Sequence, residues 1–207
     1  MKGLIIKDIF ALRQQGKILL ALFVFYAVYS AVFKNLSMLA AIIVLLCVML
    51  PVTTMAYDEK SKWDKYALSM PIPRKTIVLS KYLFAIIAEL LGVAIVVILG
   101  GIIILFTGEM AIRELLIMTL AVGGIGLFFL TLILPILFRF GVEKARFIML
   151  LVFFVPTMIV MMLPQLGIES PSAQILRPLG YLSPLIVAGI LLLSIKISIG
   201  IYNRKEF

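Results

Sequence analysis

The hydrophobic positions along this chain fall into long blocks, and short polar segments separate them. Most blocks approach the roughly 20 apolar residues that an α-helix needs to cross the hydrocarbon core of a bilayer. The pattern therefore predicts an all-α membrane protein with six transmembrane helices in a single domain, residues 1–207. The expected spans are approximately residues 18–33, 36–57, 82–106, 115–138, 147–163 and 184–201.

The segment before the first span has a different, amphipathic pattern. On a helical wheel its apolar residues fall on one side and its polar residues on the other: Leu4, Ile5, Ile9 and Leu12 against Lys7, Asp8, Gln14 and Gln15. This periodicity favours a helix in the membrane interface with its apolar side in the acyl boundary. The alternative is a plain cytoplasmic extension.

The polar segments predict the connections between spans. We expect a tight turn at Lys34–Asn35, a long polar stretch at 58–81 and a basic loop at 139–146. In the Pro-rich linker 164–183, Ser170 and Pro171 can begin a short helix that runs to Leu176, with Pro178 soon after. This predicts short external helices between spans five and six, as an alternative to an ordinary capped loop.

The distribution of Lys and Arg predicts the orientation. If the N-terminus is cytoplasmic, fifteen basic residues lie in cytoplasmic segments and three, Lys34, Arg113 and Arg177, lie outside. Lys196 lies inside the last span and can extend its amine toward the inner surface. Because short loops rich in Lys and Arg stay in the cytoplasm, both termini are expected there.

Composition narrows the function classes. Hydrophobic residues make up 64% of the 207, and the net charge of +9 is explained by the orientation signal without any nucleic acid partner. The sequence has no His and no phosphate-binding Gly-x-x-x-x-Gly-Lys-Ser/Thr loop, so we expect no catalytic, cofactor or metal site and no ATP hydrolysis on this chain. Its one cysteine, Cys47, lies in an apolar block.

Two features inside the spans are candidates for a role in transport or in helix packing. Glu89 is the acidic residue placed deep in a span, where it either faces a wet pathway or packs against a neighbouring helix or the interface. The glycines of Gly123–Gly126, and the pair formed by Ala88 and Gly92, favour close helix packing.

The stretch 58–75 carries the most information about function. Ser61 or Asp58 can cap a short helix, which should stop near Ser69 because Met70 precedes Pro71. Trp63 is expected to be an exposed aromatic anchor on this helix. A short helix held between two spans can transmit force from a bound partner; alternatively, it lies on lipid headgroups.

Residues 58–75, read DEKSKWDKYALSMPIPRK, together with Ser80–Tyr82, resemble the corresponding loop of small bacterial permeases of the type-2 ATP-binding-cassette (ABC) transporter family. The resemblance extends to the chain length, the six spans and the N-terminal interfacial helix at Met1–Asp8. Similar members include permeases that export, or confer immunity to, membrane-active peptides, such as the exporters of phenol-soluble modulins.

The resemblance implies a permease subunit of an ATP-driven exporter in the bacterial cell membrane, moving amphipathic or hydrophobic cargo such as peptides. It implies two copies of a separate ABC ATPase, which hold ATP and Mg, and a second permease copy, identical or related. The loop helix would couple to that ATPase through Lys60, Ser61, Lys62, Trp63, Asp64, Lys65, Tyr66 and Leu68. The alternative function is a non-transporting membrane scaffold, or an assembly or immunity factor, whose basic loops hold anionic lipid.

Overall fold

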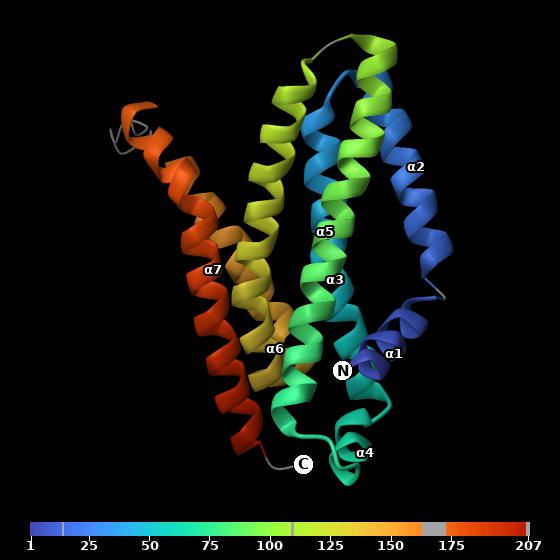
Figure 1. Cartoon of the computed structure of the whole chain (residues 1–207), viewed down its shortest axis with the longest axis vertical. Coiled ribbons are helices and arrows are strands. Elements are labelled where there is room, and N and C mark those ends of the chain that lie inside the picture. The colour runs from blue at the N-terminus through green and yellow to red at the C-terminus, as the bar shows by residue number, and fades with distance from the viewer. Residues whose placement is uncertain (14, 109, 163–172, 206–207) are drawn as a thin grey trace.

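The computed structural model describes residues 1–13, 15–108, 110–162 and 173–205, and these ranges are helical with short connections and no strand (Figure 1). The helices are α1 (Lys2–Leu12), α2 (Gly16–Phe33), α3 (Leu36–Lys60), α4 (Trp63–Ser69), α5 (Arg74–Thr107), α6 (Ile112–Met162) and α7 (Ala173–Arg204).

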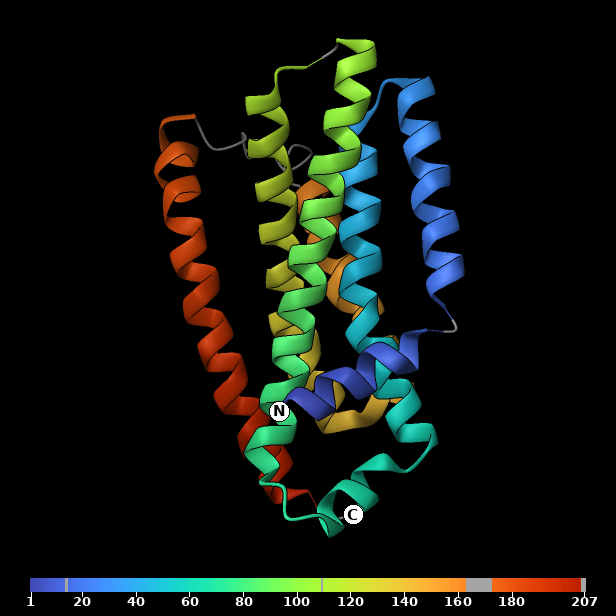
Figure 2. The ribbon, with the colours of Figure 1, turned by 45° about the vertical axis from the view of Figure 1, so that its right-hand side comes forward.

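Within the described ranges, five helices are long and apolar enough to cross a membrane: α2, α3, α5, α6 and α7. They form an elongated bundle, and the short helices α1 and α4 lie near one end of it (Figures 1 and 2). We call this the α4 end. The chain is therefore a membrane-embedded helical protein.

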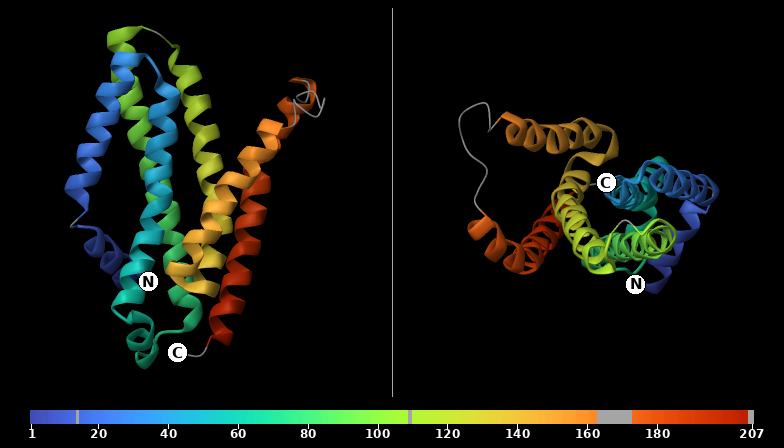
Figure 3. Two further views of the ribbon diagram at one scale, coloured as in Figure 1. Left: turned by 180° about the vertical axis from the view of Figure 1, so that it is seen from behind. Right: turned by 90° about the horizontal axis from the view of Figure 1, so that it is seen from above.

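The longest helix, α6, contains a break at Gly141, where φ is +74° and ψ is 171°. The chain reverses direction there, so that the first half of α6 runs toward the α4 end and the second half runs away from it (Figure 3). The expected basic loop at 139–146 is therefore wrong: residues on both sides are helical, and one glycine makes the turn. Only a residue without a Cβ adopts this backbone conformation easily.

Other helix boundaries also differ from the prediction. Helix α5 begins at Arg74, directly after Pro73, a residue suited to the start of a helix, so the helix extends before the span expected at 82–106 and includes Ser80 and Lys81. Helix α7 is continuous from Ala173, so the part of the expected external helix at 173–176 belongs to α7. Residues 170–172 of that prediction lie outside the described ranges. The turn at Lys34 is confirmed, with a left-handed φ of +54°.

Helix α3 lies at the centre of the packing and contacts α2, α5 and α6. A large cluster of buried side chains from α3, α5 and α6 occupies the half of the bundle near α4, and a smaller one near Leu36 occupies the other half. Helix α7 joins through hydroxyl groups: the Tyr82 hydroxyl lies 2.6 Å from Ser194 Oγ and 2.8 Å from Ser198 Oγ. Ser194 in turn donates to the Thr131 carbonyl of α6.

The amphipathic helix α1 turns its polar side toward the bundle and its apolar side outward. Asp8 is 1% exposed, whereas Ile6, Ile9 and Phe10 are each more than half exposed. This arrangement fits a helix whose apolar face enters lipid. The polar face, however, contacts α3 and α5 rather than water.

Candidate functional site

The loop helix α4 is separated from α3 by a sharp turn. Helix α3 ends at Lys60. Ser61 Oγ donates a hydrogen bond to the Tyr57 carbonyl at 2.8 Å, which gives a partner to one of the carbonyls at the end of the helix. Lys62 then takes a left-handed conformation, with φ of +52°, and α4 begins at Trp63. The extended backbone of Met70, which Pro71 favours, ends α4.

Helix α4 has an inner and an outer face. Ala67 is fully buried, and Trp63, Asp64 and Leu68 are partly buried beside it. The outer face consists of Lys62, Lys65, Tyr66 and Ser69, which are exposed at helical spacing. Tyr66 is 59% exposed. Trp63, expected to be exposed, instead packs against the large buried cluster.

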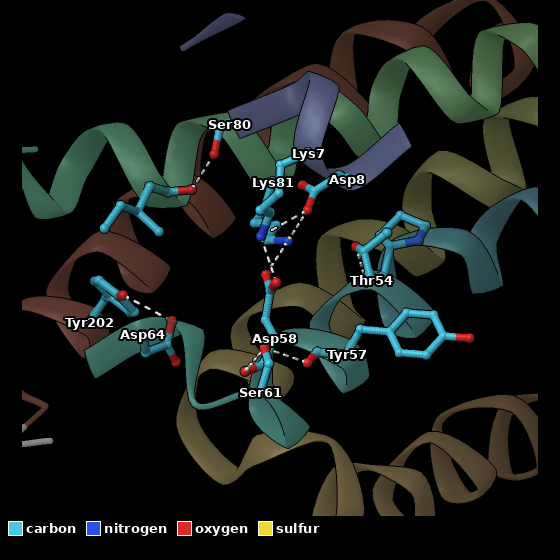
Figure 4. A network of polar contacts seen from close by, with 12 residues as sticks. Lys7, Asp8, Thr54, Tyr57, Asp58, Ser61, Asp64, Ser80, Lys81 and Tyr202 are labelled. Atoms are coloured by element: carbon cyan, nitrogen blue, oxygen red, sulfur yellow. Dashed lines mark hydrogen bonds and ion pairs between the residues drawn. The ribbon is translucent and has the colours of Figure 1, made fainter. Parts of the chain in front are cut away.

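Four charged side chains form a buried network above α4 (Figure 4). One carboxylate oxygen of Asp58, in α3, lies 2.5 Å from the Lys7 amine of α1. The other oxygen lies 2.6 Å from the Lys81 amine of α5. Lys81 also binds Asp8 at 2.7 Å, and the amine of Lys7 lies 3.2 Å from the same Asp8 oxygen. Two lysines and two aspartates neutralise one another, as buried charges require.

The network reaches α4 through an aromatic contact. The Lys7 amine lies 4.5 Å from the centre of the Trp63 ring, within the range of a cation–π interaction. Lys7 therefore contacts α3 through Asp58 and α4 through Trp63. A displacement of α4 would act directly on α1 and α3.

The end of α7 is also fixed to this region. The Arg74 guanidinium donates to the carbonyls of Tyr202, Asn203 and Lys205, which are left open at a helix C-terminus. The Tyr202 hydroxyl donates to Asp64 Oδ1 of α4 at 3.1 Å. Burial raises the pKa of Asp64, and the Tyr202 hydrogen bond opposes that increase.

Glu59 links the end of α3 to the break in α6. Its Oε2 accepts from the Val142 N–H at 2.7 Å, in the manner of a residue that caps a helix N-terminus. A Cβ at Gly141 would lie 2.8 Å from Glu59 Oε1, so a larger residue there would displace the Glu59 carboxylate from the Val142 N–H. At the α4 end, α3 thus contacts α1, α4, α5 and α6.

Glu89 lies away from this region, at the crossing of α3, α5 and α6. It is 1% exposed, and neither carboxylate oxygen has a hydrogen-bond partner among the residues described here. Its carboxylate fits against Gly126 of α6, where a Cβ would overlap it and would also lie 2.7 Å from Val44 Cγ1 of α3. The expected close packing at Gly126 is confirmed, as it is at Gly92, where a Cβ would lie 2.6 Å from Cys47 Sγ.

Almost the whole length of the sequence matches a known family. A family model described as an ABC-2 family transporter protein matches residues 3–203. The chain belongs to this family. Searches of curated proteins and of solved structures give no match. Membership makes the chain a transmembrane component of an ABC transporter and implies association with an ABC ATPase.

The predicted coupling residues of this ABC-2 permease occupy three different positions. Lys60 ends α3, Ser61 and Lys62 form the turn, and α4 holds the rest. The expected helix at 60–68 is therefore wrong at its start: α4 begins at Trp63. The Ser61 hydroxyl donates a hydrogen bond to a carbonyl at the end of α3 and does not cap α4. The structure brings Lys62, Lys65 and Tyr66 together on the outer face, while Trp63, Asp64 and Leu68 face inward. Their coupling role stays a prediction, as does a pathway role for Glu89.

Sequence reasoning missed the residues that hold the permease loop in place. They are Lys7, Asp8, Asp58 and Lys81 of the buried network, with Glu59, Arg74 and Tyr202 around it. One signal was available: Asp8 and Lys81 are each followed directly by apolar residues. An isolated charge there needs a partner, although the sequence does not say which.

Proposed function

We propose that this chain is the permease subunit of an ATP-driven ABC exporter in the bacterial cell membrane, with six spans and both termini in the cytoplasm. The bias of Lys and Arg supports that orientation. The reversal at Gly141 supports a count of six, because it divides α6 into two helices. By the same resemblance, two permease copies would assemble with two ATPase subunits that bind ATP and Mg.

The observation that carries this proposal is the attachment of α4 to the bundle. The inner face of α4 contacts Lys7 through Trp63 and Tyr202 through Asp64. Its outer face exposes Lys62, Lys65 and Tyr66, which take no part in the network. An ATPase bound to the outer face would move α4, and the ionic network would pass that movement to α1, α3 and α5.

The cargo is inferred from the surface and from the resemblance. The spanning helices present apolar side chains over much of their length, including Ile18, Leu20 and Phe25 of α2, each at least 60% exposed. We infer amphipathic or hydrophobic cargo, such as membrane-active peptides. Such cargo would move along an apolar pathway between two permease copies.

The test uses variants of the outer face of α4. We expect Tyr66→Ala combined with Lys65→Glu to leave the permease folded, because both side chains are exposed. Loss of an aromatic anchor from an interface typically costs about 2 kcal/mol or more, which corresponds to roughly thirtyfold weaker binding. The measurements are co-purification of the co-expressed ABC ATPase and transport by reconstituted vesicles.

A matched control removes an exposed aromatic residue from the opposite end of the bundle. Phe33 is 63% exposed there, and Phe33→Ala should leave ATPase binding unchanged. If the α4 variant binds its ATPase and transports like the wild type, α4 is not the coupling helix, and its outer face contacts lipid headgroups instead. If transport is absent from both variants and from the wild type while the ATPase still binds, the scaffold function fits better.

A further inference from the structure

A groove with an unusual combination of side chains opens between α6 and the last turns of α7. It encloses about 540 Å³ and is lined by Arg139, Ile197, Gly200, Ile201, Arg204 and Lys205. It lies at the α4 end of the bundle, which is the cytoplasmic end in the proposed orientation. The groove is separate from the outer face of α4 and from the buried ionic network.

The polar part of the groove is cationic. Arg139 and Arg204 are both exposed, and the Arg139 guanidinium lies over the Phe140 ring at 5.3 Å. Lys205 adds a third positive charge, which Asp64 also attracts. Two arginines that line one groove are suited to a phosphate, because each guanidinium group can donate two parallel hydrogen bonds to it.

The remaining wall of the groove is apolar and follows the helix into the spanning region. Ile197, Ile201 and Arg204 share one face of α7 at spacings of three and four residues, and Ile197 is 56% exposed. Gly200 leaves the floor open, because a Cβ there would meet no atom within 4 Å. A ligand for this groove therefore combines an anionic head with a hydrocarbon chain.

We propose that this groove binds an anionic phospholipid of the cytoplasmic leaflet. Its phosphate lies between Arg139 and Arg204, and an acyl chain runs along Ile197 and Ile201. The assignment to the cytoplasmic leaflet rests on the orientation given in the proposed function, whereas the preference for an anionic lipid follows from the groove itself. A lipid fits better than a soluble phosphate because the apolar wall continues directly into the membrane-spanning part of α7, and anionic lipids are concentrated at the cytoplasmic surface.

Photo-crosslinking of the full-length chain in phosphatidylcholine nanodiscs tests this proposal without any transport assay. Phosphatidylglycerol or phosphatidylcholine carrying a diazirine in the acyl chain is added, and labelled peptides are mapped by mass spectrometry. We expect phosphatidylglycerol to label residues 197–201 about tenfold more than phosphatidylcholine does. Arg139→Gln with Arg204→Gln should remove this preference, a change of about 1.4 kcal/mol.

Two further variants separate specific binding from a general effect of charge. Lys144→Gln with Arg146→Gln removes two exposed charges from α6 outside the groove and should keep the preference. Gly200→Leu retains every charge but fills the floor, and should reduce acyl labelling. Equal labelling by the two lipids, or an equal loss in the Lys144 and Arg146 variant, would overturn the proposal. So would full competition by soluble glycerol phosphate, because the hydrocarbon chain would then contribute nothing.

Discussion

Lys81 and Asp8 are the individual residues whose removal should matter most for the fold. They form a 2.7 Å ion pair between helices α5 and α1, and both are almost completely buried. Removing one member of a buried pair leaves an uncompensated charge, whereas removing both does not. This asymmetry distinguishes a structural ionic network from charges that merely lie close together.

We therefore predict that Lys81→Met destabilises the permease by about 3–5 kcal/mol, because Lys7 alone would face both Asp8 and Asp58. The double variant Asp8→Asn with Lys81→Met should recover most of the loss, since Lys7 and Asp58 remain a neutral pair. The measurement is the thermal unfolding midpoint of the purified chain in detergent.

The control for this experiment is Lys75→Met. Lys75 is exposed and lies on the same helix as Lys81, so its loss should change the midpoint little. An equal effect of Lys75→Met and Lys81→Met would contradict the view that the network holds α1 on the bundle.

At the scale of helices, close crossings depend on particular glycines rather than on glycine content. Gly126 lies where α6 meets Glu89 of α5 and Val44 of α3, while Gly124, two residues earlier, has no atom within 4 Å of where a Cβ would stand. The two positions lie on the same helix but have different neighbours. They therefore form a natural pair for comparison.

We predict that Gly126→Ala destabilises the bundle by about 1–3 kcal/mol, because the added methyl group overlaps neighbouring side chains. Gly124→Ala should be neutral or slightly stabilising, since alanine favours helix by about 0.5–1 kcal/mol over glycine. Thermal unfolding followed by circular dichroism measures both. If Gly124→Ala is the more harmful change, the crossing of α5 and α6 at Glu89 is wrongly placed.

The sequence predicts the helices well, because bilayer length and apolar content leave few alternatives. It does not reveal long-range contacts. The partners of Arg74 and Lys81 lie on α7, α1 and α3, far away in the sequence, so no local pattern identifies them. The loop expected at 139–146 fails for a similar reason, since Glu59 closes the turn at Gly141.

The candidate site was predictable in its location but not in its orientation. Pro71 and the charged residues around Trp63 identify α4 as a short helix between two spans. The face that α4 turns outward depends on its contacts with Lys7 and Tyr202. Lys7 belongs to α1, so α2 and α3 separate it from α4 in the sequence, and Tyr202 lies near the end of the chain. Periodicity within seven residues of helix cannot reveal such partners.

For the whole molecule, the orientation in the membrane decides whether α4 can meet a cytoplasmic ATPase. We predict that single cysteines at Lys34 and Ala111, in a Cys47→Ala background, react with a membrane-impermeant maleimide from outside the cell. Cysteines at Lys62 and Lys144 should react only after the membrane is opened. These four positions are exposed in the structure. Lys34 follows α2 and Ala111 precedes α6, whereas Lys62 precedes α4 and Lys144 follows the break at Gly141.

Each position tests a separate part of the arrangement. Lys34 follows the first span and Lys144 follows Gly141, so labelling of Lys144 from outside would contradict a cytoplasmic position for the turn at that glycine. Labelling of Lys62 from outside would place α4 beyond the reach of any cytoplasmic ATPase. The Cys47→Ala control without an added cysteine should remain unlabelled.

The separation of Asp8 and Lys81 along the chain has a consequence for how the protein is made. These partners are 73 residues apart, so helix α1 leaves the ribosome long before its counter-ion in α5 exists. At about 5–20 residues per second, translation takes roughly 4–15 seconds to cover that distance. Until α3 follows, the nascent α1 has only the membrane surface to hold it, through Ile6, Ile9 and Phe10. Asp58 of α3 then offers Lys7 a partner, and the emergence of α5 completes the network by supplying the counter-ion of Asp8.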